Sequence, residues 1–166
     1  MDKSNTAATT IDFDQMPTLG DVARYQARVR PDQLALVFEG RETTYAEFDR
    51  HTNQVANALI AAGLTKGQRI AYLGKNSDHY FELMFGALKA GVVIAPIGWR
   101  LAPPEVAYIV GDSDAVMLFV GPEVADQAAA IAPDLPNLKI VAMEPNDRRW
   151  PTFEAWRDAQ PDSDPG

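Results

Sequence analysis

The chain has 166 residues, 46% hydrophobic and 23% charged, which is enough to bury one sizeable core. Its formal net charge of -8 opposes a general affinity for nucleic acid or anionic membranes, and the absence of cysteine excludes disulfides, thiolate metal sites and cysteine nucleophiles. No targeting pattern and no apolar run of roughly 18 residues occurs, so a cytoplasmic protein without a transmembrane segment is expected.

The N-terminal part begins with a segment, residues 1–17, that we expect to be flexible. A helix is predicted from Leu19 to Val29, because apolar residues recur there at helical spacing and Pro31 prevents much continuation. Leu34–Phe38 and Thr43–Thr44 flank a polar turn, and this arrangement predicts two short strands in a hairpin.

The most strongly patterned element is a helix that opens at Thr44. Thr44 and Glu47 have the spacing of a capping box, in which each satisfies a free backbone N–H of the first turn. Apolar residues then recur at intervals of three and four from Tyr45 to Ile60, and Gly63 lies where a left-handed helix end is expected.

Beyond residue 68, strands and helices alternate. Apolar and β-branched runs of strand length are separated by segments with helical spacing, an order typical of a parallel sheet covered on both faces. The predicted strands are 69–73, 92–95, 115–120 and 138–142, and the predicted helices are 78–90, 103–110 and 123–131. The predicted fold class is therefore α/β, three-layered and doubly wound, with a mainly parallel sheet and a small N-terminal hairpin.

The C-terminal part changes character. Residues 146–166 are predicted to form a short helix carrying Phe153 and Trp156, followed by a Pro/Asp-rich linker. Residues 18–145 then make up one α/β subdomain. Because a domain that ends in a linker normally continues, we expect a missing C-terminal remainder and interpret the chain as a truncated fragment.

Several segments resemble the adenylate-forming enzymes, which include acyl-CoA synthetases, aryl-CoA ligases, luciferases and peptide-synthetase adenylation domains. In order, they are Thr43–Phe48, Asn53, Ala56, Leu59, Gly63, Gly67, Arg69–Ala71, Asn76–Ser77, Ala87–Pro96, Arg100–Leu101, Glu105 and Asp112–Ser113. These are fold signatures, not catalytic motifs, and their order and spacing cover nearly the whole chain. The resemblance implies the N-terminal portion, the first subdomain, of an acyl-CoA synthetase or fatty-acid-CoA ligase of fatty acid metabolism.

That resemblance also implies a reaction. The family joins a carboxylate to ATP, with Mg, and passes the acyl group to a thiol such as CoA, so the implied partners are a fatty or aryl acid, CoA and the remainder of the chain. The family's phosphate loop ends in Pro-Lys-Gly, and no such loop occurs here. The family's ribose-binding aspartate and C-terminal lysine are absent too. We therefore expect no catalytic residue, no metal ligand and no cofactor in the fragment, which should be inactive by itself.

One loop remains a candidate for binding. Residues 97–101 follow the carboxyl end of a parallel strand, the edge where open α/β sheets place ligands. In the CoA ligases that this sequence resembles, the corresponding arginine lies near the CoA entrance, which implies that Arg100 meets a CoA phosphate and Trp99 flanks the nucleotide. Alternatively, Arg100 bonds to Glu105 or a helix end, and Trp99 packs against a neighbouring subdomain.

Other chemistries find less support. A dinucleotide site needs Gly-x-Gly-x-x-Gly after its first strand, and the turn after Leu73 has one glycine. A hydrolase triad lacks the Gly-x-Ser-x-Gly elbow. His79 is interpreted as a surface or interdomain residue, and Lys89 as a solvated residue of a last helical turn. Asp112 and Asp114, which flank Ser113, are interpreted as turn-forming groups rather than metal ligands. The alternative from another class is a non-catalytic interaction or dimerisation module, with a homo-oligomer as one of its states.

Overall fold

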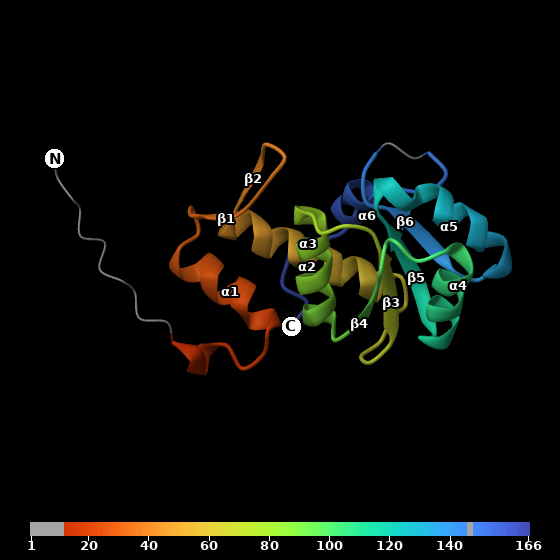
Figure 1. The fold of residues 1–166 in the computed structure, drawn as a ribbon. Helices are drawn as coiled ribbons and strands as arrows, with labels where there is room; N and C mark the ends of the chain where they lie inside the picture. The colour runs from red at the N-terminus through yellow and green to blue at the C-terminus, as the bar shows by residue number, and fades with distance from the viewer. Residues whose placement is uncertain (1–11, 146–147) are drawn as a thin grey trace.

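A computed structural model describes residues 12–145 and 148–166 (Figure 1). Most of the predicted N-terminal segment 1–17 lies outside the described residues, as do positions 146 and 147 of the predicted linker. Within the described part, no helix is both long enough and apolar enough to cross a membrane. The first described element is a short 3-10 helix, Phe13–Gln15.

The N-terminal elements are two helices and a hairpin. Helix α1 spans Gly20–Val29, strands β1 (Leu34–Phe38) and β2 (Arg41–Thr44) pair antiparallel, and helix α2 spans Tyr45–Ala61. The hairpin turn needs only Glu39 and Gly40, both with positive φ, as in the two-residue turns that match strand twist. At the start of α2 the predicted capping box is present: Glu47 N–H donates to Thr44 Oγ1, and Thr44 N–H donates to Glu47 Oε2 over 2.9 Å.

The remaining elements form the predicted doubly wound sheet. Four parallel strands lie in the order β4-β3-β5-β6 (Figure 1). In chain order, the elements are β3 (Arg69–Leu73), α3 (Asp78–Ala90), β4 (Val93–Ile97), α4 (Pro103–Asp112), β5 (Ala115–Val120), α5 (Ala125–Ile131), β6 (Lys139–Ala142) and α6 (Phe153–Asp158). The chain leaves β3 toward one edge of the sheet and β5 toward the other, so the topology reverses between these two strands.

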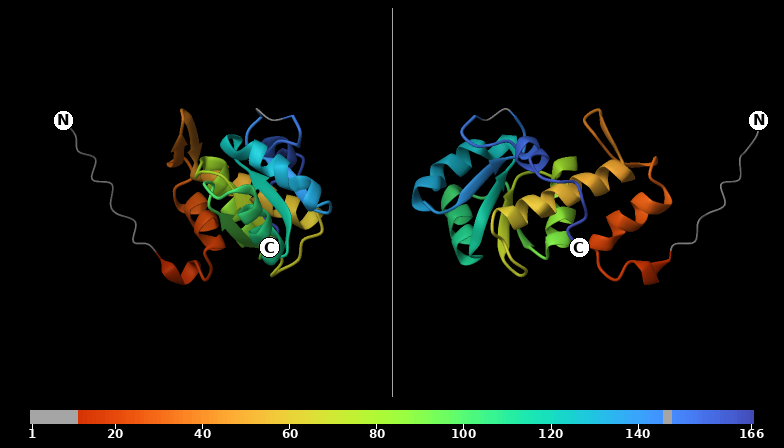
Figure 2. Two further views of the ribbon diagram at one scale, coloured as in Figure 1. Left: turned by 45° about the vertical axis from the view of Figure 1, so that its right-hand side comes forward. Right: turned by 180° about the vertical axis from the view of Figure 1, so that it is seen from behind.

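The side chains of each strand divide between two cores. Along β3, Ile70 and Tyr72 pack with α2 and α3, whereas Ala71 and Leu73 pack with α4 and α5. Because successive side chains of a strand point to opposite faces, the sheet separates two apolar layers. Figure 2 shows α4 and α5 on one side of the sheet and α2 and α3 on the other. The predicted fold class, an α/β three-layer arrangement with a small hairpin, is confirmed.

Two polar side chains lie deeper than the sequence suggested. His79 is 3% exposed, and its ring packs against Phe153. Lys89 is 8% exposed, with its ammonium 2.6 Å from Asp49 Oδ1. The surface or interdomain interpretation of His79 and the solvated interpretation of Lys89 are therefore wrong, because each residue faces a neighbouring element rather than water. Asp114 has φ +52° and does form a turn.

Candidate functional site at the carboxyl edge of the sheet

The loops that follow β3 and β5 meet where the topology reverses, the usual ligand position in open α/β sheets. Gly121 N–H donates to Leu73 O over 2.8 Å, extending the strand pairing by one step. A Cβ on Gly74 would lie 3.1 Å from Gly121 Cα, and a Cβ on Gly121 would lie 3.0 Å from Gly74 Cα. Both positions therefore favour glycine. The backbones of the two loops are in direct contact here, with no space between them for a side chain.

Lys75 follows Gly74 and is held through its backbone. Its N–H donates to Glu123 Oε1 over 2.6 Å, and its carbonyl accepts a hydrogen bond from the Tyr72 hydroxyl. Burial, with a smaller contribution from the negative charge of Glu123, raises the pKa of Tyr72, so its hydroxyl stays a donor. The loop after β3 is thus fixed to the loop after β5. These bonds hold the Lys75 backbone in place, while its side chain is exposed.

The side chain of Lys75 reaches the loop after β4. Its Nζ lies 4.7 Å from the centroid of the Trp99 ring, and Arg100 Cζ lies 4.1 Å from the same centroid. Trp99 is partly buried, whereas Arg100 is exposed. The structure thus brings both predicted site residues together and adds Lys75. We call Lys75, Trp99 and Arg100 the cationic corner.

The open question about Arg100 has a structural answer. Glu105, its suggested partner, accepts a hydrogen bond from Ala102 N–H over 2.8 Å and so caps α4. Within the described part of the chain, Arg100 makes no hydrogen bond or ion pair, and its guanidinium contacts the ring of Trp99. Two cations beside one ring, without a carboxylate between them, repel each other and favour an anionic ligand.

Lys75 also lines a cavity of about 560 Å³. It is lined by Phe38, Glu39, Tyr72, Lys75, Asn76, Ser77, Gly121, Pro122, Glu123, Met143, Glu144 and Pro145. The three glutamates outnumber the single lysine, so the local potential opposes a phosphate or carboxylate ligand. An anion is better accommodated at the cationic corner than in this cavity.

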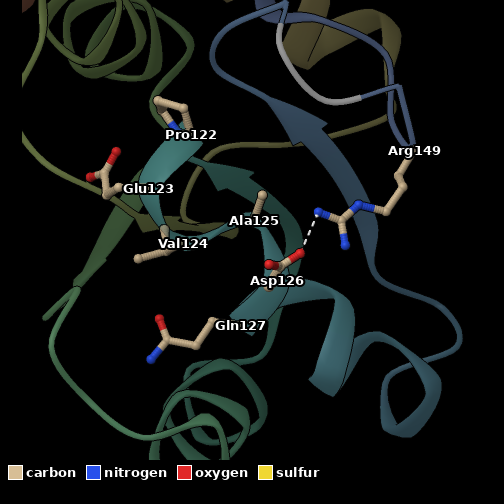
Figure 3. Close-up of a pocket in the computed structure, with 7 residues that line it drawn as sticks. All are labelled: Pro122, Glu123, Val124, Ala125, Asp126, Gln127 and Arg149. Carbon is tan, nitrogen blue, oxygen red and sulfur yellow. Dashed lines mark hydrogen bonds and ion pairs between the residues drawn. The ribbon is translucent and has the colours of Figure 1, made fainter.

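A second, smaller cavity of about 310 Å³ adjoins the start of α5 (Figure 3). Asp126 and Arg149 face each other across it at 3.0 Å, while Glu123 and Gln127 lie on the other side. The Gln127 side-chain amide donates to Leu101 O. This bond ties α5 to the loop that carries Trp99 and Arg100, so Gln127 helps to hold that loop in place.

Three potential metal ligands, Asp78, His79 and Glu144, lie within 4.8 Å of one another. Arg41 already occupies both carboxylates: it forms two bonds to Asp78, of 2.7 and 2.8 Å, and two to Glu144, of 2.9 and 3.5 Å. Burial alone would raise the pKa of Asp78, but Arg41 and His79 together outweigh burial and the pKa is lowered. This cluster is an ion-pair network between the hairpin, α3 and the loop after β6.

Sequence reasoning did not identify Lys75 or Gln127. Lys75 lies on a different loop from Trp99, so no sequence spacing links the two residues. The parallel pairing of β3 with β4 brings their loops together, and that register follows only from the folded sheet. The one available signal was a lysine placed directly after the glycine that follows a predicted strand.

Comparison with known proteins identifies the family. Residues 23–165 match the model of the AMP-binding enzyme family. The chain is 41% identical over 155 residues to the fatty acid–[acyl-carrier-protein] ligase ScoC of Streptomyces coeruleorubidus, covering 91% of this chain and 28% of the ligase. It is 40% identical over 114 residues to a feruloyl-CoA synthase of an Amycolatopsis species, covering 69% of this chain and 23% of the synthase.

Solved structures of CoA ligases show the same fold relationship. The anthranilate CoA ligase AuaEII, in complex with anthranoyl-AMP, superposes with a TM-score of 0.82 at 29% identity, over 92% of this chain and 30% of the ligase. The N-terminal domain of FACL13 from Mycobacterium tuberculosis gives a TM-score of 0.79 at 29% identity, over 91% of this chain and 38% of that domain. The chain thus spans about a quarter to two fifths of the proteins it matches. With the matching residues extending over most of its length, the chain belongs to the AMP-binding enzyme family and has the fold of the N-terminal part of its CoA ligases.

Proposed function

We propose that this chain contributes the N-terminal part of an ATP-dependent acid–thiol ligase. Such an enzyme activates a carboxylic acid as its acyl-adenylate and transfers the acyl group to a thiol. The supporting observation is the match of residues 23–165 to the AMP-binding enzyme family, with relatives named as ligases of fatty and aromatic acids. Fatty or aryl acids are accordingly the proposed substrates, and the cytoplasm is the proposed location.

The chain alone is proposed to be inactive. Formation of an acyl-adenylate needs cationic and N–H groups around a triphosphate, because negative charge develops as pyrophosphate leaves. The Ser/Thr/Gly-rich loop that ends in Pro-Lys-Gly in this family has no counterpart among the 166 residues. ATP, Mg and CoA would therefore be bound chiefly by residues that this chain does not supply.

The cationic corner is the proposed exception. Lys75 and Arg100 would bind phosphate groups of the acceptor, and Trp99 would contact its nucleotide. The residues fit such a group: a guanidinium can donate two parallel hydrogen bonds to a phosphate, and lysine adds a compact positive charge. Relatives named as CoA ligases and one named as an acyl-carrier-protein ligase suggest the shared phosphopantetheine arm as the acceptor. CoA is our proposal, because its ribonucleotide end supplies both phosphate and a flat base.

Calorimetry with MgATP tests the claim of inactivity. We expect no heat of specific binding when the 166-residue chain is titrated, and no pyrophosphate release after addition of a fatty or aryl acid. A micromolar dissociation constant would show that the nucleotide site lies within this chain, and would contradict the proposal that ATP is bound chiefly by residues outside it.

The non-catalytic alternative, an interaction or dimerisation module, is distinguished by reading the gene beyond codon 166. A loop ending in Pro-Lys-Gly there favours the ligase, and its absence favours the module.

A further inference from the structure

The segment after α6 runs along α2 and ends beside α1 (Figure 2, right). We call residues 160–166 the strap. Side-chain amides of α2 donate to four successive strap carbonyls: Gln54 to Gln160 O (3.2 Å), Asn57 to Pro161 O (2.8 Å), Asn53 to Asp162 O (3.0 Å) and Asn57 to Ser163 O (2.9 Å). The contact is therefore made mainly with backbone atoms of the strap.

Asn53, Gln54 and Asn57 form the amide row. Positions 53 and 57 lie four residues apart and so share one side of the helix. Because the row recognises carbonyl oxygens, which every residue has, most strap side chains are free to vary. The strap resembles a bound peptide whose binding surface is a helix face.

Lys89 of α3 fixes the orientation of one amide in the row. Its ammonium donates to Asn53 Oδ1 over 2.6 Å, which leaves Asn53 Nδ2 facing Asp162 O. Asp49 holds the same ammonium at 2.6 Å, and the Lys89 side chain is fully buried. Lys89 is therefore a positioning residue for the strap, acting through Asn53 across the α2–α3 interface.

The far end of the strap is held by α1. Arg24 Nε lies 2.6 Å from Asp164 Oδ2, and Arg24 Nη2 lies 2.7 Å from Asp164 Oδ1, a two-bond pairing of guanidinium and carboxylate. Arg24 Nη1 also bonds to Asp21 over 3.0 Å. The strap thus joins α1 to α2 by a route separate from the chain between them, which passes through the hairpin.

We propose that the strap is a clamp that holds α1 on the α2–α3 layer, with the amide row as its seat and the Arg24–Asp164 pair as its closing contact. This role is independent of the proposed ligase activity. Only one strap side chain, that of Asp164, needs a defined chemistry in this arrangement. Displacing the strap should therefore release α1 while leaving the sheet and its far helices in place.

Amide hydrogen exchange on the full 166-residue chain tests the clamp, with Asp164→Asn as the variant. The matched control is Asp162→Asn, which removes the same charge two residues earlier, where the structure uses only the backbone carbonyl. We expect Asp164→Asn to speed exchange in α1 about two- to fivefold, the range for loss of a partly exposed ion pair. Exchange in α5, beyond the sheet, should be unchanged.

A second variant, Arg24→Gln, should reproduce the faster exchange in α1, and the double variant should add little to either single change. Equal acceleration by Asp162→Asn would assign the effect to net charge and overturn the proposal. Faster exchange confined to the strap, with α1 as protected as in the unsubstituted chain, would also overturn it, because the strap would then hold only itself.

Discussion

Gly86 of α3 lies directly against Val55 of α2. A Cβ on Gly86 would come within 2.4 Å of Val55 Cβ and 3.0 Å of Thr52 O, and Val55 is fully buried. The two helices therefore pack at a distance that no other residue at position 86 allows without movement. This contact sets the spacing of the layer on which α1 and the strap rest.

Gly86→Ala should destabilise the fold by about 1 to 3 kcal/mol, because the added methyl group overpacks a buried interface. Gly111→Ala is the control: Gly111 is an exposed residue of α4 with no atom near the position of its Cβ, so alanine there should stabilise by about 0.4 to 1 kcal/mol. Urea unfolding measures both. Equal stability of the two variants would contradict the close contact.

A buried ion pair joins α3 to α6. Glu82 Oε2 lies 2.5 Å from Arg157 Nη1, both side chains are almost completely buried, and Glu82 Oε1 lies 2.7 Å from His51 Nδ1. Glu82→Leu should cost about 3 kcal/mol, the lower end for breaking a buried pair, since Arg157 loses its buried partner and keeps only the exposed Asp158, 2.7 Å from its Nε. The double change Glu82→Leu with Arg157→Leu should be less damaging than the sum of the singles. Simple additivity in thermal unfolding would show that the pair is not coupled.

The strap should loosen in acid. The hydrogen bonds and charge of Arg24 lower the pKa of Asp164 from 3.8 to about 2. A carboxylate with a lowered pKa contributes stability that is complete above its unfolded value and is lost as the pH falls through its folded value. Between about pH 4 and pH 2 the native chain should therefore lose stability relative to Asp164→Asn, which has no carboxylate to titrate. Parallel pH profiles for the two proteins would contradict the pairing.

Adenosine 3′,5′-bisphosphate, the nucleotide end of CoA without its arm, probes the cationic corner directly. We expect it to shift the NMR signal of the Trp99 indole N–H, and we expect Lys75→Ala and Arg100→Ala each to weaken binding about tenfold or more, as for loss of one charge-assisted bond. Arg69→Ala is the control, since Arg69 is an exposed cation at the opposite end of β3. Equal weakening by Arg69→Ala would indicate unspecific attraction.

Much of the fold was predictable from local patterns. Apolar runs and capping signals located the hairpin, α2 and the parallel strands, because these elements depend on residues close together in sequence. The strap was not predictable: residues 160–166 were interpreted as a linker, and their Pro and Asp content is indeed typical of one. Their binding depends on backbone carbonyls, which leave no mark in the sequence.

The burial of Lys89, which was expected to be solvated, was missed for a similar reason. Lys89 lies one residue before the end of α3, where an exposed cation is usual, yet Asp49 and Asn53 of α2 draw it into the helix interface. Its burial lowers the pKa of Lys89, while Asp49 opposes the shift. Helical periodicity identifies apolar faces, but it does not reveal hydrogen-bond and ion-pair partners, such as Asp49 and Asn53, that lie about forty residues away in the sequence.

Joining this chain to the remainder of its Streptomyces relative tests the central claim most directly. In the chimera, residues 1–166 would replace the aligned N-terminal part of the fatty acid–[acyl-carrier-protein] ligase, to which they are 41% identical. The measurement is acid-dependent pyrophosphate release from MgATP, with the parent ligase as reference and the 166-residue chain alone as blank. We expect release by the chimera and none by the chain. A chimera that folds like its parent but releases no pyrophosphate with any acid that the parent accepts would contradict the proposal that this chain contributes the N-terminal part of an acid–thiol ligase.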